Sequence, residues 1–230
     1  MIKKVVSLIL ILLIAVASFF IYKGWSKYDY ALKEVSLEEM VASVRESENF
    51  TPIDNVSETF LQAIASVEDR RFYHHKGIDS IGLARAIVTD IKNRKLAEGG
   101  STITQQLAKN LYFMGEESIE RKIAEMFTAI KIEKNYSKKE ILELYVNVIY
   151  YGSGYYNIYD ASMGYFGKEP SQLTDFEATL LAGVPNAPSK YSPKVNKELS
   201  YKRQEKVLDA MVKSGYITKE ESKNLILQQK

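Results

Sequence analysis

The first candidate for chemistry is Glu68, a carboxylate at the end of a predicted helix. Phe60 and Ile64 precede it by eight and four residues, so the three side chains share the face that we expect to be buried. Burial disfavours the charged form of a carboxylate, which suits a general base or acid working near neutral pH. A competing interpretation is that Glu68 and the next residue pair with the two arginines that follow, Arg70 and Arg71.

A second candidate is a polar face on a helix that we predict to begin near Ser101. Hydroxyl, amide and ammonium groups share this face: Thr102, Gln105, Gln106 and Lys109. The apolar residues of the segment fall on the opposite face: Ile103, Leu107 and Leu111. A polar face without an acid suits an anionic or sugar-like ligand. The competing interpretation is a capping box at the helix start followed by a solvated surface.

The third candidate is Glu125, which follows Arg121 and Lys122 by four and three residues. This spacing lets all three side chains meet on one helical surface. An apolar stripe is turned away from them: Ile119, Ile123, Phe127 and Ile130. Two interpretations stay open on local grounds. One is a surface ion pair of little energetic value, and the other is a carboxylate set among cations beside a phosphorylated leaving group.

Composition excludes several other chemistries. The chain has no cysteine, which removes thiolate catalysis and disulfides. His74 and His75 are adjacent and point in different directions, and no HExxH motif occurs, so we predict no zinc site. The 31 basic and 29 acidic side chains nearly cancel, and no dense basic tract indicates nucleic-acid binding.

The elements that must position these residues are predicted to be helices. Four capping boxes mark helix starts outside the candidate site: Ser36 with Glu39, Ser137 with Glu140, Thr174 with Glu177, and Thr218 with Glu221. Apolar residues at helical spacing follow each of them, and no alternating pattern is long enough for a sheet of several strands. Residues 95–100, 150–154 and 185–193 interrupt the helical pattern through glycine or proline, and loops of this kind commonly form a cleft.

A separate apolar segment lies at the N-terminus. Residues 5–22 form an uncharged run of 18 residues, just long enough to cross the hydrocarbon core of a membrane. Lys3 and Lys4 before it favour a cytoplasmic N-terminus. A cleaved signal peptide is the alternative, because residues 15–17 form a small-x-small site. The apolar run continues beyond that site, which favours an uncleaved anchor, and in either case the remaining chain is exported.

Taken in order, these segments resemble the motifs of glycosyltransferase family 51. That family comprises the glycosyltransferase domain of class A penicillin-binding proteins and the monofunctional peptidoglycan transglycosylases. Residues 68–77 are similar to the first motif, EDxxFxxHxG, residues 100–110 to the second, GSTITQQLxKN, and residues 121–125 to the third, RKxxE. Residues 145–168 and 177–188 resemble the fourth and fifth motifs. The resemblance covers roughly residues 50–215.

The resemblance implies a fold and a domain organisation. The expected fold is mainly α, a lysozyme-like helical lobe with a smaller membrane-proximal jaw lobe, preceded by one N-terminal transmembrane helix. We expect a cytoplasmic stub at residues 1–4, a transmembrane signal-anchor at 5–22, a membrane-proximal segment at 23–49, the glycosyltransferase domain at 50–215 and a C-terminal helix at 216–230. The protein would be a single-pass protein of the cytoplasmic membrane with its catalytic domain on the extracytoplasmic side.

The resemblance also implies an activity, the polymerisation of lipid II into glycan strands. Glu68 would deprotonate the acceptor GlcNAc 4-hydroxyl, which attacks the donor MurNAc anomeric carbon with inversion and releases undecaprenyl pyrophosphate. Glu125 would be the second catalytic residue, orienting the cations or holding a divalent metal; Mg²⁺ or Mn²⁺ is the one cofactor left open. The implied substrate-binding residues are Asp69, Phe72, His75, Arg85, Ser101, Thr102, Gln105, Gln106, Lys109, Asn110, Arg121 and Lys122.

The expected partners are lipid II and the growing lipid-linked glycan, the cytoplasmic membrane, and separate transpeptidases with other cell-wall machinery, but no nucleic acid. Two other functions stay open: a lysozyme-like lytic transglycosylase that cleaves glycan, and a catalytically inactive cell-wall scaffold. The chain departs from the family pattern at residues 155–157, Tyr-Tyr-Asn, where a small glycine-containing segment is often seen. It also carries Glu116 and Glu117 where some relatives have a basic residue.

Overall fold

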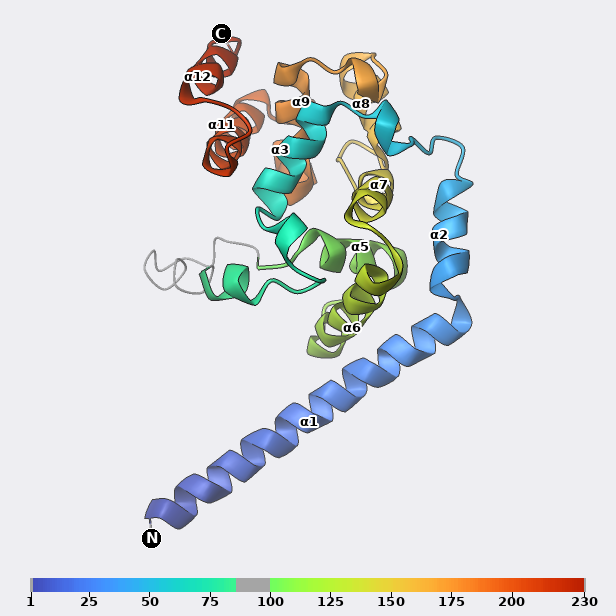
Figure 1. Cartoon of the computed structure of the whole chain (residues 1–230), viewed down its shortest axis with the longest axis vertical. Coiled ribbons are helices and arrows are strands. Elements are labelled where there is room, and N and C mark those ends of the chain that lie inside the picture. The colour runs from blue at the N-terminus through green and yellow to red at the C-terminus, as the bar shows by residue number, and fades with distance from the viewer. Residues whose placement is uncertain (1, 86–99, 230) are drawn as a thin grey trace.

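The computed structural model describes residues 2–85 and 100–229, and every regular element in these two ranges is a helix (Figure 1). The predicted mainly α class is therefore confirmed, while most of the predicted loop at residues 95–100 lies outside the described residues. The α-helices are α1 (Ile2–Glu34), α2 (Leu37–Arg45), α3 (Glu58–Glu68), α5 (Ile103–Tyr112), α6 (Ile119–Asn135), α7 (Lys138–Val148), α8 (Ile158–Phe166), α9 (Asp175–Ala182), α10 (Pro188–Tyr191), α11 (Lys197–Ser214) and α12 (Lys219–Leu227). The 3-10 turns are η1 (Ile53–Asn55), η2 (Phe72–His74), η3 (Pro170–Gln172) and η4 (Val184–Asn186).

Helix α1 extends without interruption from the apolar segment into the folded body (Figure 1). Its 33 residues span roughly 50 Å at about 1.5 Å per residue, against about 30 Å for a hydrocarbon core. The predicted anchor at residues 5–22 is thus the first part of a longer helix. By length and composition α1 can cross a membrane, and a signal sequence near an N-terminus would satisfy the same criteria.

The second part of α1 packs against α6. Gly24 is buried in this contact, and a Cβ atom there would lie 2.4 Å from the Ile123 side chain. The rings of Tyr28 and Phe127 lie 5.8 Å apart. The apolar stripe predicted on α6 therefore contributes its Ile123 and Phe127 to the contact with the N-terminal helix, on a different face from Glu125.

The predicted capping boxes all form, with both hydrogen bonds present in each. They begin α2, α5, α7, α9 and α12. Each box satisfies amide groups that a helix start would otherwise leave unpaired, a contribution of about 1 kcal/mol. Local sequence thus determines where these helices begin.

The core joins two groups of helices. α3 packs against α9 and α11, and α5 packs against α6 and α7. The largest buried side chains between the elements are aromatic: Phe60, Phe72, Tyr145 and Tyr151. The last turn of α3 and the first turns of α5 meet where the two groups adjoin, and this junction positions the candidate site.

Two predicted interruptions lie against each other at Gly152 and Pro188, and the second contributes Pro185 and Asn186 to the cavity described below. At residues 150–154 the chain turns through positive φ angles at Gly152, Ser153 and Gly154; a Cβ atom on Gly152 would lie 2.8 Å from the Pro188 carbonyl oxygen, so the close approach requires glycine. Residues 185–193 were expected to be extended or turning, which is wrong at Pro188–Tyr191, where the chain forms the short helix α10. Proline is tolerated there because the first residue of a helix needs no N–H partner.

Candidate active site

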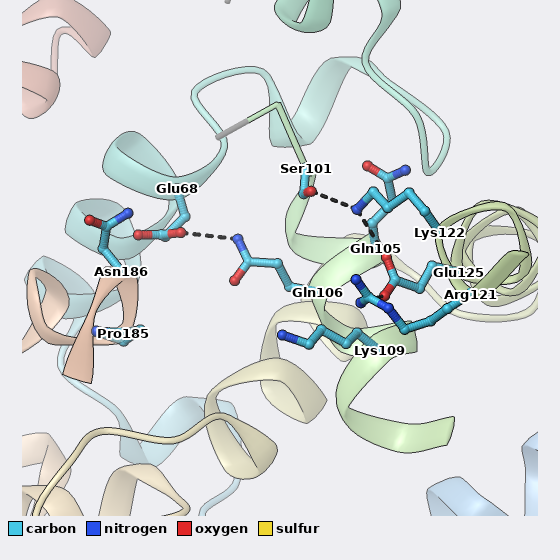
Figure 2. A pocket seen from close by; sticks show the side chains of 10 residues that line it. All are labelled: Glu68, Ser101, Gln105, Gln106, Lys109, Arg121, Lys122, Glu125, Pro185 and Asn186. Atoms are coloured by element: carbon cyan, nitrogen blue, oxygen red, sulfur yellow. Dashed lines mark hydrogen bonds and ion pairs between the residues drawn. The ribbon is translucent and has the colours of Figure 1, made fainter. Parts of the chain in front are cut away.

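A cavity of about 310 Å³ lies where α3, α5, α6 and η4 approach one another (Figure 2). Its lining residues are Glu68, Ser101, Gln105, Gln106, Lys109, Arg121, Lys122, Glu125, Pro185 and Asn186. All except Pro185 and Asn186 are predicted site residues. In Figure 2, Glu68 and Asn186 lie on one side, Glu125 with its cations lies on the other, and Gln106 and Lys109 lie between them. The fold thus brings all three sequence candidates to one cavity.

Glu68 is the last residue of α3, and its side chain is only 8% exposed. Gln106 Nε2 donates to Glu68 Oε2 at 3.0 Å, and Arg203 Nη2 donates to Glu68 Oε1 at 3.3 Å. Arg71 instead pairs with Asp79 at 3.2 Å. The competing interpretation, a local ion pair between Glu68 and the arginines that follow it, is therefore wrong.

A buried tyrosine orients the amide that contacts Glu68. The Tyr145 hydroxyl donates to Gln106 Oε1 at 3.1 Å, which leaves the amide nitrogen directed at Glu68. Burial raises the pKa of Tyr145 well above its usual value, and the nearby Glu68 carboxylate adds to the effect. Tyr145 therefore keeps its proton and remains a donor at any physiological pH.

The opposite wall centres on Glu125, whose side chain is 1% exposed. Arg121 Nη1 donates to Glu125 Oε1, and Lys122 Nζ donates to Glu125 Oε2 at 2.9 Å and to Ser101 Oγ at 2.7 Å. A surface ion pair is therefore the wrong interpretation of these three residues. Lys109 is exposed and has no hydrogen-bond or ion-pair partner among the described residues, so this side of the cavity carries more positive than negative charge.

Three predicted residues lie behind the cavity wall and connect its parts. Asp69 Oδ2 accepts the Ile103 N–H at 3.0 Å and lies 2.8 Å from His75 Nε2. Gly77 N–H donates to His75 Nδ1 at 3.2 Å, so the proton of a neutral His75 sits on Nε2 and is donated to Asp69. Thr102 Oγ1 donates to the Gly77 carbonyl at 2.6 Å. These bonds fasten the end of α3 to the start of α5.

The remaining predicted substrate-binding residues do not line the cavity. Phe72 is fully buried in the core. Asn110 donates from Nδ2 to the Gln106 carbonyl at 2.8 Å, one turn back along α5. Arg85 is exposed in the helical residues 80–85. A role for these three in substrate binding stays a prediction.

Arg203, Asn186 and Pro185 are the cavity or near-cavity residues that sequence reasoning did not name as site residues. Arg203 lies on α11 four residues before the buried Val207, so a charged group falls on the buried stripe of its helix. The same pattern identified Glu68 on α3 and could have identified Arg203. Asn186 lies in η4 and has no comparable periodic pattern around it.

The donor set does not fit a resident divalent cation. Both carboxylate oxygens of Glu125 are bound by cationic side chains. Across residues 2–85 and 100–229, no three His, Cys, Asp or Glu side chains come close enough together to hold a metal ion. Mg²⁺ and Mn²⁺ require several oxygen ligands, so we derive no step through a metal held by the protein.

Comparison with known proteins decides the family. The family described as Transglycosylase matches residues 34–212. The chain belongs to this family. Its members are peptidoglycan glycosyltransferases, so this transglycosylase is an enzyme of peptidoglycan synthesis.

Several relatives match over most of the chain. A protein of Cupriavidus necator named as a transglycosylase is 40% identical over 193 residues, covering 84% of this chain and 83% of the relative. Penicillin-binding protein 1A of Aquifex aeolicus is 46% identical over 172 residues, covering 75% of this chain and 24% of the relative. The transglycosylase therefore spans about a quarter of the length of that penicillin-binding protein. The crystal structure of penicillin-binding protein 1A from Haemophilus influenzae is 33% identical, with a TM-score of 0.38 over 54% of this chain and 15% of the other.

Proposed function

We propose that this transglycosylase polymerises lipid II, with Glu68 as the base and the opposite wall of the cavity as the site of the leaving pyrophosphate. The acceptor GlcNAc 4-hydroxyl loses its proton to Glu68 and attacks the donor MurNAc anomeric carbon. The bond from that carbon to undecaprenyl pyrophosphate breaks, and the anomeric configuration inverts. Lipid II is the substrate class that the family implies.

The observation that carries this proposal is the separation of charge across the cavity. The buried carboxylate lies on one side, Arg121 and Lys122 lie on the other, and exposed Lys109 lies between them (Figure 2). Inversion requires the nucleophile and the leaving group on opposite faces of the reacting sugar. A base on one wall and cations on the opposite wall of a cavity of about 310 Å³ support that arrangement.

The hydrogen bonds to the Glu68 carboxylate suit it to the role of base. Its two oxygens are bound by Gln106 and Arg203, so the carboxylate has a fixed orientation before substrate enters. Fixed geometry of this kind lowers the entropy cost of reaction. A pyrophosphate already leaves readily, so the mechanism needs no strong acid on the leaving-group side.

The cations have a complementary role. Arg121 and Lys122 donate to Glu125, and Lys109 completes a positively charged edge of the cavity. Charge-assisted hydrogen bonds to phosphate oxygens stabilise the charge that develops as the bond to the leaving group breaks. Glu125 orients these cations. A glycan-cleaving enzyme would have no use for them, which argues against the lytic alternative.

We further propose that α1 is retained as a single-pass anchor and that the catalytic domain lies on the extracytoplasmic side. The helix is long and apolar enough to span a bilayer. Lipid II and the growing glycan are themselves tethered to the membrane, so an anchored enzyme meets them within one surface. Crosslinking by separate transpeptidases belongs to the same proposal.

The test is Glu68→Gln in the full chain with lipid II in detergent. The amide keeps the size and shape of the side chain, but it has one acceptor oxygen in place of two and cannot take the proton. We expect the polymerisation rate to fall by roughly 10²- to 10⁴-fold, the usual contribution of a general base. Gel separation of glycan products and a parallel incubation with finished peptidoglycan distinguish synthesis from cleavage.

Glu58→Gln is the matched control, because Glu58 is exposed on the first turn of the same helix. It should polymerise lipid II at the wild-type rate. Turnover of Glu68→Gln at that rate would remove Glu68 from the base role. A wild-type chain that cleaves peptidoglycan and leaves lipid II unchanged would refute the function itself.

A further inference from the structure

We propose that Arg203 is a positioning residue for Glu68, a cation supplied by α11 that keeps the base aimed at the cavity. The proposal rests on the proposed function of Glu68 as base. Arg203 is 135 residues away along the chain and is not among the cavity-lining residues. It acts through Glu68 and not on the substrate.

The guanidinium group of Arg203 is held by three contacts. Nη2 donates to Glu68 Oε1 at 3.3 Å, Nε donates to the Gly183 carbonyl at 3.4 Å, and the group lies 5.9 Å from the centre of the Tyr191 ring. The side chain is only 15% exposed. A guanidinium fixed by a carbonyl and an aromatic ring presents one donor to the carboxylate in a set direction.

Gly183 provides the space for this arrangement. A Cβ atom at Gly183 would lie 2.9 Å from Arg203 Cγ and 3.3 Å from the Leu180 carbonyl oxygen. The backbone at Gly183 has φ −78° and ψ −21°, which any residue adopts. An added methyl group would therefore displace the Arg203 side chain, while the backbone conformation at this position would not be strained.

The charges around Glu68 explain why this cation matters. Gln106 of α5 and Tyr145 of α7 are neutral donors in its network, and Asp69 follows it directly as a second acid. The cations of α6 face Glu125 on the far wall, while Lys109 projects from α5 into the cavity between the two walls (Figure 2). Among residues 2–85 and 100–229, Arg203 is the cation in direct contact with the carboxylate, so it is the charged donor that fixes the direction of Glu68.

The experiment compares Arg203→Met with Arg203→Lys in steady-state polymerisation of lipid II. For Arg203→Met we expect kcat to fall roughly 10- to 100-fold with KM within about twofold, the pattern of a misplaced catalytic group. Arg203→Lys should recover part of kcat, because its ammonium group is still a charged donor at that end of the side chain.

Gly183→Ala is an independent variant that leaves the charge in place. It should lower kcat in the same direction as Arg203→Met and by a smaller factor. Lys202→Met is the control, since Lys202 is the exposed neighbour on α11 and pairs with Glu198. We expect it to match the wild type in kcat and in KM.

The outcomes separate this proposal from the proposed function. If the wild-type chain polymerises lipid II and Arg203→Met keeps its kcat, the positioning role is overturned while the function stands. A rise in KM alone would overturn it in favour of direct substrate binding. Equal loss of kcat in the Met and Lys variants, with a lowered melting temperature, would make Arg203 merely structural. A wild-type chain inactive on lipid II would refute the function first.

Discussion

At the scale of the residue, the cavity combines the proposed base with a second carboxylate that is bound by two cations. Glu125 is buried, and its oxygens accept hydrogen bonds from Arg121 and Lys122 of its own helix. In the proposed mechanism, Glu125 acts through the direction in which it holds these two cations.

Glu125→Gln tests that dependence. The amide retains one acceptor but presents an NH₂ group toward a cation, so Arg121 or Lys122 should turn away from its present position. We expect kcat/KM for lipid II to fall by roughly 10²-fold, as when a preorganised charge contact is lost. The free energy of unfolding should drop by about 1–3 kcal/mol, since a buried partner is left unsatisfied. Polymerisation kinetics and urea denaturation measure the two effects.

Glu120→Gln, on the same helix and partly exposed, is the control and should retain wild-type kinetics. Wild-type polymerisation by Glu125→Gln would show that the positions of the cations do not depend on Glu125.

The sequence revealed part of this site for a physical reason. Helical periodicity placed Glu68 on the buried face of α3, and the i to i+4 spacing placed Arg121 beside Glu125. Both relations are local. The partner of Glu68 is on a different helix, and no local rule connects residues 68 and 203, so only the folded structure identifies the pair.

At the scale of the element, the start of α5 depends on a carboxylate from outside the helix. Asp69 closes α3, accepts the first amide of α5 and binds His75. The end of α3 and the start of α5 are thereby joined behind the cavity. This position gives Asp69 and His75 a structural task that the motif by itself does not reveal.

Asp69→Asn should weaken this junction. Both hydrogen bonds go to Oδ2, so an amide oxygen in that place can still accept them but lacks the charge that strengthens both. We expect a loss of about 1–3 kcal/mol in the free energy of unfolding, seen as a lower melting temperature. Lipid II turnover should fall as well, because Gln106 and Glu68 are no longer held at the distance and orientation of their hydrogen bond.

Asp54→Asn is the comparison, because the Asp54 side chain is 81% exposed and its pair with Lys139 lies on the surface. A surface pair contributes about 0–1 kcal/mol, so this variant should unfold almost as the wild type does. An unchanged melting temperature for Asp69→Asn would contradict the structural task given to Asp69.

The helix starts and the proline-rich segment at residues 185–193 differ in how well the sequence predicts their conformation. The starts were predicted because capping boxes are short patterns whose hydrogen bonds form within four residues. The segment at residues 185–193 was harder, since proline forbids some conformations without choosing among the rest. Contacts with α11 and with the turn at Gly152 stabilise the short helix α10 in this segment.

At the scale of the whole molecule, α1 is docked onto the helix that carries the cations. Gly24 lets the two helices approach closely at Ile123, and Lys27 pairs with Glu116 at 2.5 Å. The residues Arg121 and Lys122 lie within one turn of that contact. The position of α6, and with it the cationic wall, therefore depends on the N-terminal helix.

Gly24→Leu should separate α1 from α6. The new side chain would overlap Ile123, and overpacking of this kind costs about 1–3 kcal/mol. We expect a lower melting temperature in detergent and a fall in kcat of roughly 10-fold or more, because displacement of α6 misplaces the cations. Ser26→Leu adds the same side chain at an exposed position of α1 and should have little effect. Equal activity of the two variants would show that the helix contact has no influence on the site.

The absence of a break in α1 has a consequence for how the enzyme meets its surroundings. If α1 spans the bilayer as we propose, the segment between the membrane span and Gly24 is continuous helix. The catalytic domain then has no hinge in this segment about which it could rotate. One residue inserted into that segment would turn the cavity by about 100° around the membrane normal and raise it by about 1.5 Å. The direction in which each new glycan strand leaves the enzyme, relative to the membrane, would then depend on the number of residues in α1 between the membrane span and Gly24.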